Sequence, residues 1–304
     1  MVSSYARPRL TVHILGIGRL MATIRLGLIG DNIRRSQSPL LHVLAGRLSG
    51  LDVSYEPLIP ADLGLDFEAV FDRCRNGGFR GINITYPYKE RVFRRLDVRQ
   101  AGVRALGACN IAIFGADAPL GDNTDYSGFK SAFAETFPGA SPGIVAMAGA
   151  GGVGKAVAFG LADLGASEIR LFDHDVSKAA ALQDALAAAA PGLSVRLAAT
   201  IEEAAAAADG LVNCTPLGMG GYPGTAIPRE AIAGQRWAFD AVYTPVNTQF
   251  LTAAASAGLA TMSGYELFFH QGIDAFRIFT GHDVDQTELR AALAEAHGTE
   301  LSGP

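Results

Sequence analysis

The fold of this 304-residue chain is decided by the stretch IVAMAGAGGVG, which spans Ile144–Gly154. Its first five residues form an uninterrupted apolar run, which is typical of a strand buried on both faces of a parallel sheet. Glycines follow at the first, third and sixth positions of a G-x-G-x-x-G pattern, and a helical pattern begins at about Val153. Such glycines allow a tight turn, close approach of the backbone to a pyrophosphate, and close packing of helix on strand. The stretch therefore predicts a Rossmann domain that binds a dinucleotide at the N-terminus of this helix.

The choice of dinucleotide depends on Asp173, which ends the next predicted strand at the spacing of roughly 20 residues that the pattern requires. A carboxylate at this position can accept hydrogen bonds from both ribose hydroxyls of NAD, whereas it would repel the 2′-phosphate of NADP. The segment 173–178 contains no arginine that could bind this phosphate. We therefore predict NAD as the cofactor, and NADP only as the less favoured choice. The alternative is that Asp173 simply caps the helix that follows it.

Short apolar runs alternate with helical patterns on both sides of the glycine-rich turn. This alternation is typical of mostly parallel sheets covered by helices, so we predict an α/β fold with two domains and a cleft between them. The substrate domain comprises residues 24–123 plus 265–304, the Rossmann domain comprises residues 124–264, and residues 1–23 are expected to form a disordered extension. The expected strands are 25–30, 53–58, 81–84, 144–148, 168–172, 194–197, 210–214 and 237–242. The expected helices are 40–48, 63–74, 89–96, 125–137, 153–164, 178–189, 201–208, 248–257 and 265–279.

Composition excludes several classes of protein. The 25 Lys and Arg residues against 30 Asp and Glu residues give a net charge of −5, so the chain lacks the basic excess that is typical of nucleic-acid-binding proteins. Polar residues or glycines interrupt every apolar run well before the roughly 20 residues that a membrane span needs. Cys74, Cys109 and Cys214 lie far apart without a CxxC pair, which favours a reducing cytoplasm and argues against a disulfide or a metal site.

Polar side chains cluster in three further segments, Ser36–Pro39, Asn83–Lys89 and Asn123–Asp125. These segments resemble those of the shikimate/quinate dehydrogenase family. The segment NITYPYK, Asn83–Lys89, follows a predicted parallel strand, at the edge where such sheets bind ligands, and matches the family's catalytic-lysine segment. The segment Asn123–Asp125 matches its aspartate segment, and Ser36–Pro39 matches its serine pair. The resemblance runs in order from about Arg25 to Gly281 and includes Gly107–Asn110, Asn213–Met219, Asp240–Pro245 and His270-Gln271.

The resemblance implies a dehydrogenase whose catalytic pair is Lys89 and Asp125. Oxidation of a secondary alcohol needs a hydride acceptor on one side and a proton acceptor at the hydroxyl. Asp125 would stabilise the charged lysine while burial opposes that charge, so the pair can tune a proton shuttle. Which of the two takes the proton first stays open, because coupled groups titrate as a pair. The alternative is that Lys89 is an exposed residue at a helix start and that Asp125 is an ordinary N-cap.

The resemblance also implies a substrate with a six-membered ring that bears hydroxyl groups and a carboxylate. The residues expected to bind the carboxylate are Ser36, Ser38 and Tyr243. The residues expected to bind the ring hydroxyls are Asn83, Thr85, Asn110, Asp125 and Gln271. A pocket of fixed donors and acceptors rejects analogues that lack a matching hydroxyl. The residues expected to bind the cofactor are Gly149, Ala150, Gly151, Gly152, Val153, Asp173, Asn213, Thr215, Leu217, Val242, Gly264 and Leu267.

The resemblance leaves several points open. The acidic residue Asp173 resembles the residue found at this position in the NAD-using, quinate-degrading branch of the family. Shikimate-preferring members also carry a serine at the position of Ser38, so the expected substrate is shikimate, quinate or both. The alternative functions are a dehydrogenase of a related cyclic acid, such as an aminoshikimate, and a non-catalytic dinucleotide or metabolite sensor. Two residues depart from the family pattern: Cys109 is a small apolar replacement, and Glu266 lies where a small residue is common, on the helix expected to face the nicotinamide. We expect a monomer or homodimer whose partner is a small-molecule substrate rather than a nucleic acid or a membrane.

Overall fold

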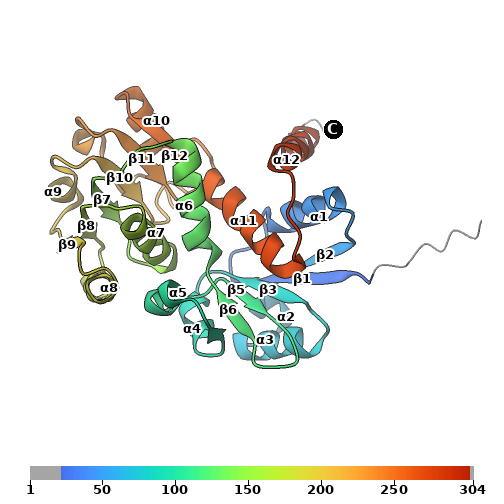
Figure 1. The fold of residues 1–304 in the computed structure, drawn as a ribbon. Coiled ribbons are helices and arrows are strands. Elements are labelled where there is room, and N and C mark those ends of the chain that lie inside the picture. Colours follow the sequence, from blue (N-terminus) through green and yellow to red (C-terminus); the bar gives the residue numbers. More distant parts are fainter. Residues whose placement is uncertain (1–21, 302–304) are drawn as a thin grey trace, which may run out of the picture.

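The computed structural model describes residues 22–301, which contain two separate six-stranded sheets (Figure 1). The first sheet is formed by the N-terminal part of the chain, coloured blue to green, and the second by the later part, coloured green to orange. The helices α6 (Thr124–Thr136) and α11 (Gly264–Thr280) run between the two sheets. The disordered extension expected over residues 1–23 lies, apart from Ala22 and Thr23, outside the described residues.

The first sheet mixes parallel and antiparallel pairs in the order β2-β1-β3-β5-β6-β4. β1 pairs in parallel with β2 and β3, but β5 runs antiparallel to both β3 and β6. β4 again pairs in parallel with β6, so β5 is the strand that departs from the mostly parallel arrangement expected here. β4, β5 and β6 were not predicted, because strands of two or three residues are too short to show a periodic pattern. The strands are β1 (Ile24–Ile29), β2 (Val53–Leu58), β3 (Gly81–Ile84), β4 (Asp97–Val98), β5 (Ile111–Ile113) and β6 (Leu120–Asp122).

One helix of this half differs from the prediction. The single helix expected over 63–74 is wrong, because a short helix ends at Gly64, where φ is +63°, outside the helical range. A new helix then begins at Phe67, and the preceding residue, Asp66, caps it by accepting a hydrogen bond from the Ala69 amide at 2.8 Å. The helices of this half are α1 (Ser38–Leu48), α2 (Pro60–Leu63), α3 (Phe67–Asn76), α4 (Lys89–Phe93) and the unpredicted α5 (Ala101–Leu106).

The second sheet is parallel throughout and has the order β12-β11-β10-β7-β8-β9. β7 carries the glycine-rich stretch and lies between β8 and β10, so the strand order reverses at β7, which is where open parallel sheets bind ligands. The predicted Rossmann fold is confirmed, with β12 as an unpredicted edge strand. The strands are β7 (Ile144–Ala148), β8 (Glu168–Phe172), β9 (Ser194–Leu197), β10 (Gly210–Asn213), β11 (Trp237–Asp240) and β12 (Ala260–Ser263). The helices are α7 (Gly152–Asp163), α8 (Val176–Ala189), α9 (Ile201–Ala205), the short 3-10 helix η1 (Arg229–Ala231) and α10 (Gln249–Ser256).

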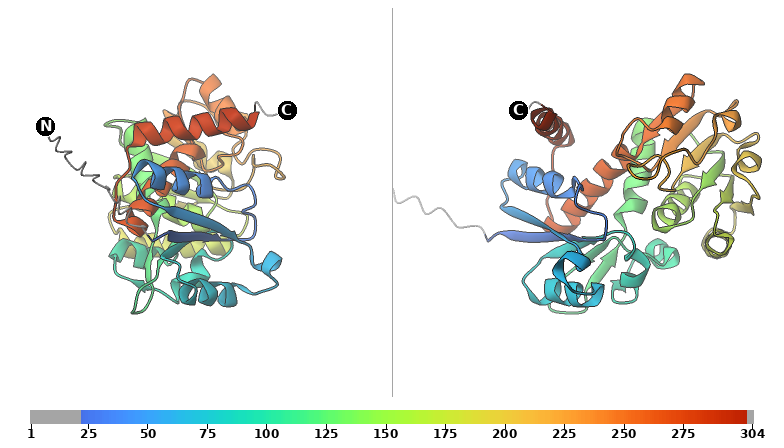
Figure 2. Two further views of the ribbon diagram at one scale, coloured as in Figure 1. Left: turned by 90° about the vertical axis from the view of Figure 1, so that its right-hand side faces the viewer. Right: turned by 180° about the vertical axis from the view of Figure 1, so that it is seen from behind.

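The two halves meet where α6 lies against α11 (Figure 2). Their backbones approach so closely that a Cβ atom on Gly128 would lie 2.5 Å from the backbone nitrogen of Gln271. The last helix, α12 (Gln286–Leu301), was not predicted; it packs beside α1 and buries Leu289 and Leu293 in the core of the first half. The chain thus returns to its first half after completing the second sheet.

Candidate active site

Lys89 and Asp125 are 36 residues apart in the chain and form a buried ion pair. Lys89 begins α4 and Asp125 lies in the first turn of α6, and Nζ of the lysine lies 2.6 Å from Oδ2 of the aspartate. Their exposed fractions are only 8% and 7%, so each group supplies the counter-charge that the other needs in the interior. Lys89 is therefore not an exposed residue. Asp125 is not the N-cap of α6 either, because Asn123 accepts the capping hydrogen bond from Tyr126 N at 3.2 Å.

The glycine-rich turn lies directly beside this pair. A Cβ atom on Gly152 would lie 3.4 Å from Cδ of Lys89. At Gly149 φ is +99°, and a Cβ atom there would lie 2.7 Å from the carbonyl carbon of Cys214, so this position requires glycine. A Cβ atom on Gly151 would instead meet none of the described residues within 4 Å. The turn therefore offers open backbone at the start of α7, which fits a pyrophosphate.

Asp173 is bound to the same turn. One of its carboxylate oxygens accepts a hydrogen bond from Ala150 N at 2.7 Å, and the other accepts one from Asp175 N at 2.8 Å. The cap of α8 is Asp175, whose carboxylate accepts from Ser177 N at 3.1 Å, so Asp173 does not serve as the helix cap. Its place, at the end of the strand next to the turn, is where Rossmann domains hold the adenosine ribose.

The residues predicted to bind a carboxylate lie together. The Ser36 hydroxyl donates to Oγ of Ser38 at 3.2 Å. The Ser36 side chain also lies close enough to Tyr243, from the loop after β11, to act in the direction that lowers the pKa of its hydroxyl. Burial raises the pKa of Tyr243, so its hydroxyl stays protonated at neutral pH. The structure therefore brings together three hydroxyl groups from two segments that are about 200 residues apart in the chain.

The predicted ring-binding residues Asn110 and Gln271 converge on Thr124. Thr124 N donates to Oδ1 of Asn110 at 2.7 Å, and Nδ2 of Asn110 donates back to the Thr124 hydroxyl at 3.0 Å. The same hydroxyl donates to Oε1 of Gln271 at 3.4 Å. Because Thr124 directly precedes Asp125, this network holds the start of α6 in place. Thr124 was not predicted, although it lies within the segment that carries the resemblance.

Asn83 and Thr85 lie at the carboxyl end of β3. Asn83 is buried, and its Oδ1 accepts a hydrogen bond from the Tyr55 hydroxyl at 2.9 Å. Thr85 N donates to the carbonyl of Ile29 at 2.9 Å, so Thr85 lies where β1 and β3 both end. Tyr55 was not predicted as a site residue, because a tyrosine in a half-buried strand has the pattern of an ordinary core residue.

Asp240 connects the two loops that the resemblance assigns to the nicotinamide side. Its Oδ1 accepts hydrogen bonds from Asn213 Nδ2 at 2.9 Å and from Val242 N at 3.0 Å, and its Oδ2 accepts one from the Thr248 hydroxyl at 2.6 Å. Burial raises the pKa of Asp240 to about 6, while these hydrogen bonds act in the opposite direction. Asn213 extends the network to two more of the predicted cofactor residues, Thr215 and Leu217. Asp240 itself was not predicted as a site residue, although it begins the matched segment Asp240–Pro245.

α11 begins against the second of these loops. A Cβ atom on Gly264 would lie 2.4 Å from the Ala241 carbonyl oxygen, so this close contact requires glycine. Leu267, one turn later, is buried. Glu266, the residue of this helix that departs from the family pattern, accepts a hydrogen bond from Arg290 of α12 at 2.7 Å.

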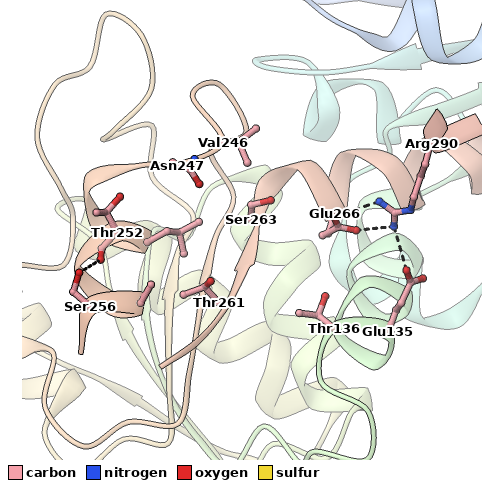
Figure 3. Close-up of a pocket in the computed structure, with 12 residues that line it drawn as sticks. Glu135, Thr136, Val246, Asn247, Thr252, Ser256, Thr261, Ser263, Glu266 and Arg290 are labelled. Carbon is pink, nitrogen blue, oxygen red and sulfur yellow. Dashed lines mark hydrogen bonds and ion pairs between the residues drawn. The ribbon is translucent and has the colours of Figure 1, made fainter. Parts of the chain in front are cut away.

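Glu266 also lines a separate cavity of about 860 Å³ between α6, α10, α11 and α12 (Figure 3). None of its lining residues belongs to the predicted site. The carboxylates of Glu135 and Glu266 lie near the His270 ring, a set that could in principle hold a metal ion. The Arg290 guanidinium already pairs with both carboxylates, at 3.3 and 2.7 Å, and supplies the positive charge there.

Comparisons with known proteins agree with this arrangement. Residues 28–112 match the family model described as the shikimate dehydrogenase substrate binding domain. The chain is 39% identical over 278 residues to the quinate/shikimate dehydrogenase (NAD(+)) of Corynebacterium efficiens, a match that covers 88% of this chain and 97% of that protein. The chain belongs to the shikimate/quinate dehydrogenase family.

Other members of the family extend the same likeness. The shikimate dehydrogenase (NADP(+)) of Pseudarthrobacter chlorophenolicus is 37% identical over 280 residues, which are 90% of this chain and 96% of that protein. The solved structure of the quinate dehydrogenase of Corynebacterium glutamicum in complex with NAD is 37% identical and has a TM-score of 0.83, covering 90% of this chain and 99% of that one.

Membership in the family confirms the predicted resemblance and the fold class. The first sheet belongs to a substrate domain and the second to a Rossmann domain for a nicotinamide dinucleotide. The chain is an oxidoreductase that acts on CH–OH groups. No described helix combines the length and the hydropathy that crossing a membrane requires.

Proposed function

We propose that this chain is an NAD-dependent dehydrogenase that interconverts shikimate with 3-dehydroshikimate, quinate with 3-dehydroquinate, or both. The observation that supports this best is the buried ion pair of Lys89 and Asp125, in which Nζ lies 2.6 Å from Oδ2. This pair lies directly beside the glycine-rich turn. A ring hydroxyl placed at this pair would have a proton acceptor on one side and the dinucleotide on the other. NAD, when bound, accepts the hydride of the oxidised carbon.

The polar residues of the site suit a cyclic acid. We assign the substrate carboxylate to the hydroxyls of Ser36, Ser38 and Tyr243, and the ring hydroxyls to the amide and hydroxyl groups of Asn83, Thr85, Asn110 and Gln271 with Asp125. These residues are held by the hydrogen bonds described above, so their donors and acceptors have set positions. A site of this kind rejects an analogue that leaves one of its buried groups unpaired.

Asp173 supports NAD over NADP as the cofactor. Two backbone amides hold its carboxylate at the turn, where a 2′-phosphate would meet a like charge at short range. The neighbouring segment 173–178 supplies no arginine as a counter-charge. Relatives that use either dinucleotide are similar to this chain, so the preference needs its own measurement.

The domain boundaries follow from the same assignment. We propose a substrate domain of residues 24–123 plus 265–304 and a Rossmann domain of residues 124–264, with the active site in a cleft between them, in a cytoplasmic monomer or homodimer. The two sheets support this division, because each is built only from strands of one proposed domain.

Steady-state kinetics with shikimate or quinate, each with NAD or NADP, tests the proposal. We expect NADH production from at least one acid, with a higher kcat/KM for NAD than for NADP. A purified protein that binds NAD but reduces it with neither acid, from neutral to alkaline pH, contradicts the proposal and favours a sensor. Higher turnover of an amino-substituted cyclic acid than of either substrate points instead to the related-acid alternative.

A further inference from the structure

Tyr55 is hydrogen-bonded to the predicted substrate residue Asn83, although it matches none of the motifs that indicate the site. It belongs to β2, an edge strand of the first sheet, and is only 8% exposed. β1 lies between β2 and β3, with Leu26 paired to Tyr55 and Leu28 paired to Asn83. The Tyr55 side chain therefore spans a strand to reach Asn83.

The Tyr55 hydroxyl contacts residues of the proposed substrate site. It donates a hydrogen bond to Oδ1 of Asn83 at 2.9 Å. The Ser38 side chain lies close enough to act on the same hydroxyl, in the direction that lowers its pKa. Ser38 in turn accepts a hydrogen bond from the Ser36 hydroxyl at 3.2 Å. The Tyr55 hydroxyl therefore lies between Asn83, assigned to a ring hydroxyl, and the serine pair assigned to the carboxylate.

The ring of Tyr55 is itself fixed. It stacks on the ring of His42, with centroids 4.8 Å apart and an angle of 15° between the planes. Both residues are buried, and burial lowers the pKa of His42 to about 3, so the imidazole is neutral at physiological pH. A buried, stacked phenol loses few rotamers when it makes a hydrogen bond, so its hydroxyl is a rigid anchor for Asn83.

We propose that Tyr55 is a positioning residue that sets the orientation of the Asn83 amide and thereby the specificity of the site for a ring oxygen; this rests on the proposed function. Because the Tyr55 hydroxyl donates, it selects the oxygen end of the amide. The NH₂ group of Asn83 is then directed away from Tyr55 and can only donate a hydrogen bond. The site therefore requires an oxygen acceptor on the substrate at this position.

Tyr55→Phe tests this inference, because it removes the hydroxyl and keeps the ring that stacks on His42. We expect the KM for the cyclic acid to rise about five- to tenfold, as for the loss of one hydrogen bond, with the KM for NAD unchanged. Tyr265→Phe is the matched control: it removes a half-buried phenol hydroxyl in α11 whose ring packs against the same core, and both KM values should keep their wild-type values.

A double-mutant cycle with Asn83→Ala separates positioning from a general structural effect. If Tyr55 acts through Asn83, Tyr55→Phe has no further effect on the KM for the acid once Asn83 is alanine. Additive effects, an unchanged KM for the acid in Tyr55→Phe, or equal rises in both KM values together with a lowered Tm overturn the inference.

Calorimetric binding of shikimate and quinate to the wild type and to Tyr55→Phe distinguishes this inference from the proposed function. If the wild type binds an acid without producing NADH, the proposed function fails. In that case the positioning role stands if Tyr55→Phe weakens binding about five- to tenfold, and it fails if affinity is unchanged. If the wild type binds neither acid, both proposals fail.

Discussion

The cofactor side and the substrate side of the candidate site are built in different ways. On the cofactor side, one stretch of eleven residues supplies a strand, a turn and a helix start, and the groups it presents are mostly backbone groups. On the substrate side, the polar side chains come from residues as far apart as Ser36 and Gln271. The first can be predicted from local pattern alone, whereas the second exists only after the two sheets and α11 have packed together. Four predictions test this contrast, beginning with the largest expected effect.

Lys89→Ala should lower kcat by about 10²- to 10⁴-fold, because it removes one member of the proton-transfer pair. NAD binding, measured by fluorescence titration, should persist, because the glycine-rich turn is built from other residues. Lys178→Ala, which removes an exposed lysine of α8, is the control and should leave kcat unchanged. Full activity in Lys89→Ala would mean that the buried pair is structural only.

Gly149→Ala should abolish NAD binding and destabilise the Rossmann domain, because its Cβ atom would lie 2.7 Å from the Cys214 carbonyl carbon at a φ of +99°. Gly139→Ala provides a matched control: its φ is +73°, but a Cβ atom there meets no described residue within 4 Å. The control should lose only about 1–2 kcal/mol of stability, the cost of the left-handed backbone. Chemical unfolding and NAD titration compare the two variants, and equal losses would show that the close contact is unimportant.

Asp240 should make the stability of the protein depend on pH. Its pKa rises from 3.8 to about 6 on folding, so the folded protein holds this proton more tightly than the unfolded chain. The resulting stabilisation is complete below about pH 4 and is lost as pH rises through 6, which corresponds to about 3 kcal/mol. Asp240→Asn should remove this dependence. The measurement is urea unfolding of both proteins at several pH values between 4 and 8, and parallel pH profiles would contradict the prediction.

Asp173→Ser should raise the ratio of kcat/KM for NADP to that for NAD by about tenfold, because it removes a negative charge from the site of the 2′-phosphate. Asp175→Ser changes a neighbouring carboxylate that caps α8, and serine can still cap the helix. This control should leave the ratio unchanged. A ratio that does not respond to Asp173→Ser would place the cofactor preference in other residues.

Local pattern and tertiary packing also separate the elements that could be predicted from the sequence from those that could not. The strand, turn and helix around Ile144–Gly154 were predicted because their pattern is local, and so was the place of Asp173 after the next strand. β5 and β6 were not predicted, because their three-residue runs are defined by pairing with distant strands. The break between α2 and α3 was missed because the helical pattern of apolar residues continues across it. Only the left-handed backbone of Gly64 shows that the first helix ends there.

The site residues divide in a similar way. Lys89 and Asp125 were found through matching segments, and the structure adds that they meet at 2.6 Å. Three residues of the site were missed: Tyr55, Thr124 and Asp240. Each holds another residue through a hydrogen bond between separate segments of the chain, and the sequence alone does not show that these segments meet. A motif records which groups contact a ligand, but it does not record what holds those groups.

By itself, the amino-acid sequence determined the α/β class, the Rossmann turn, the family and the chemical types of the site residues, because these depend on short-range periodicity and on backbone conformations that few residues adopt. The tertiary structure alone decided that a lysine and an aspartate share a buried contact, that Glu266 pairs with Arg290, and that Tyr55 binds the side chain of Asn83. The physical reason is that burial and hydrogen bonding depend on distances between segments, which are set only when the helices and sheets pack.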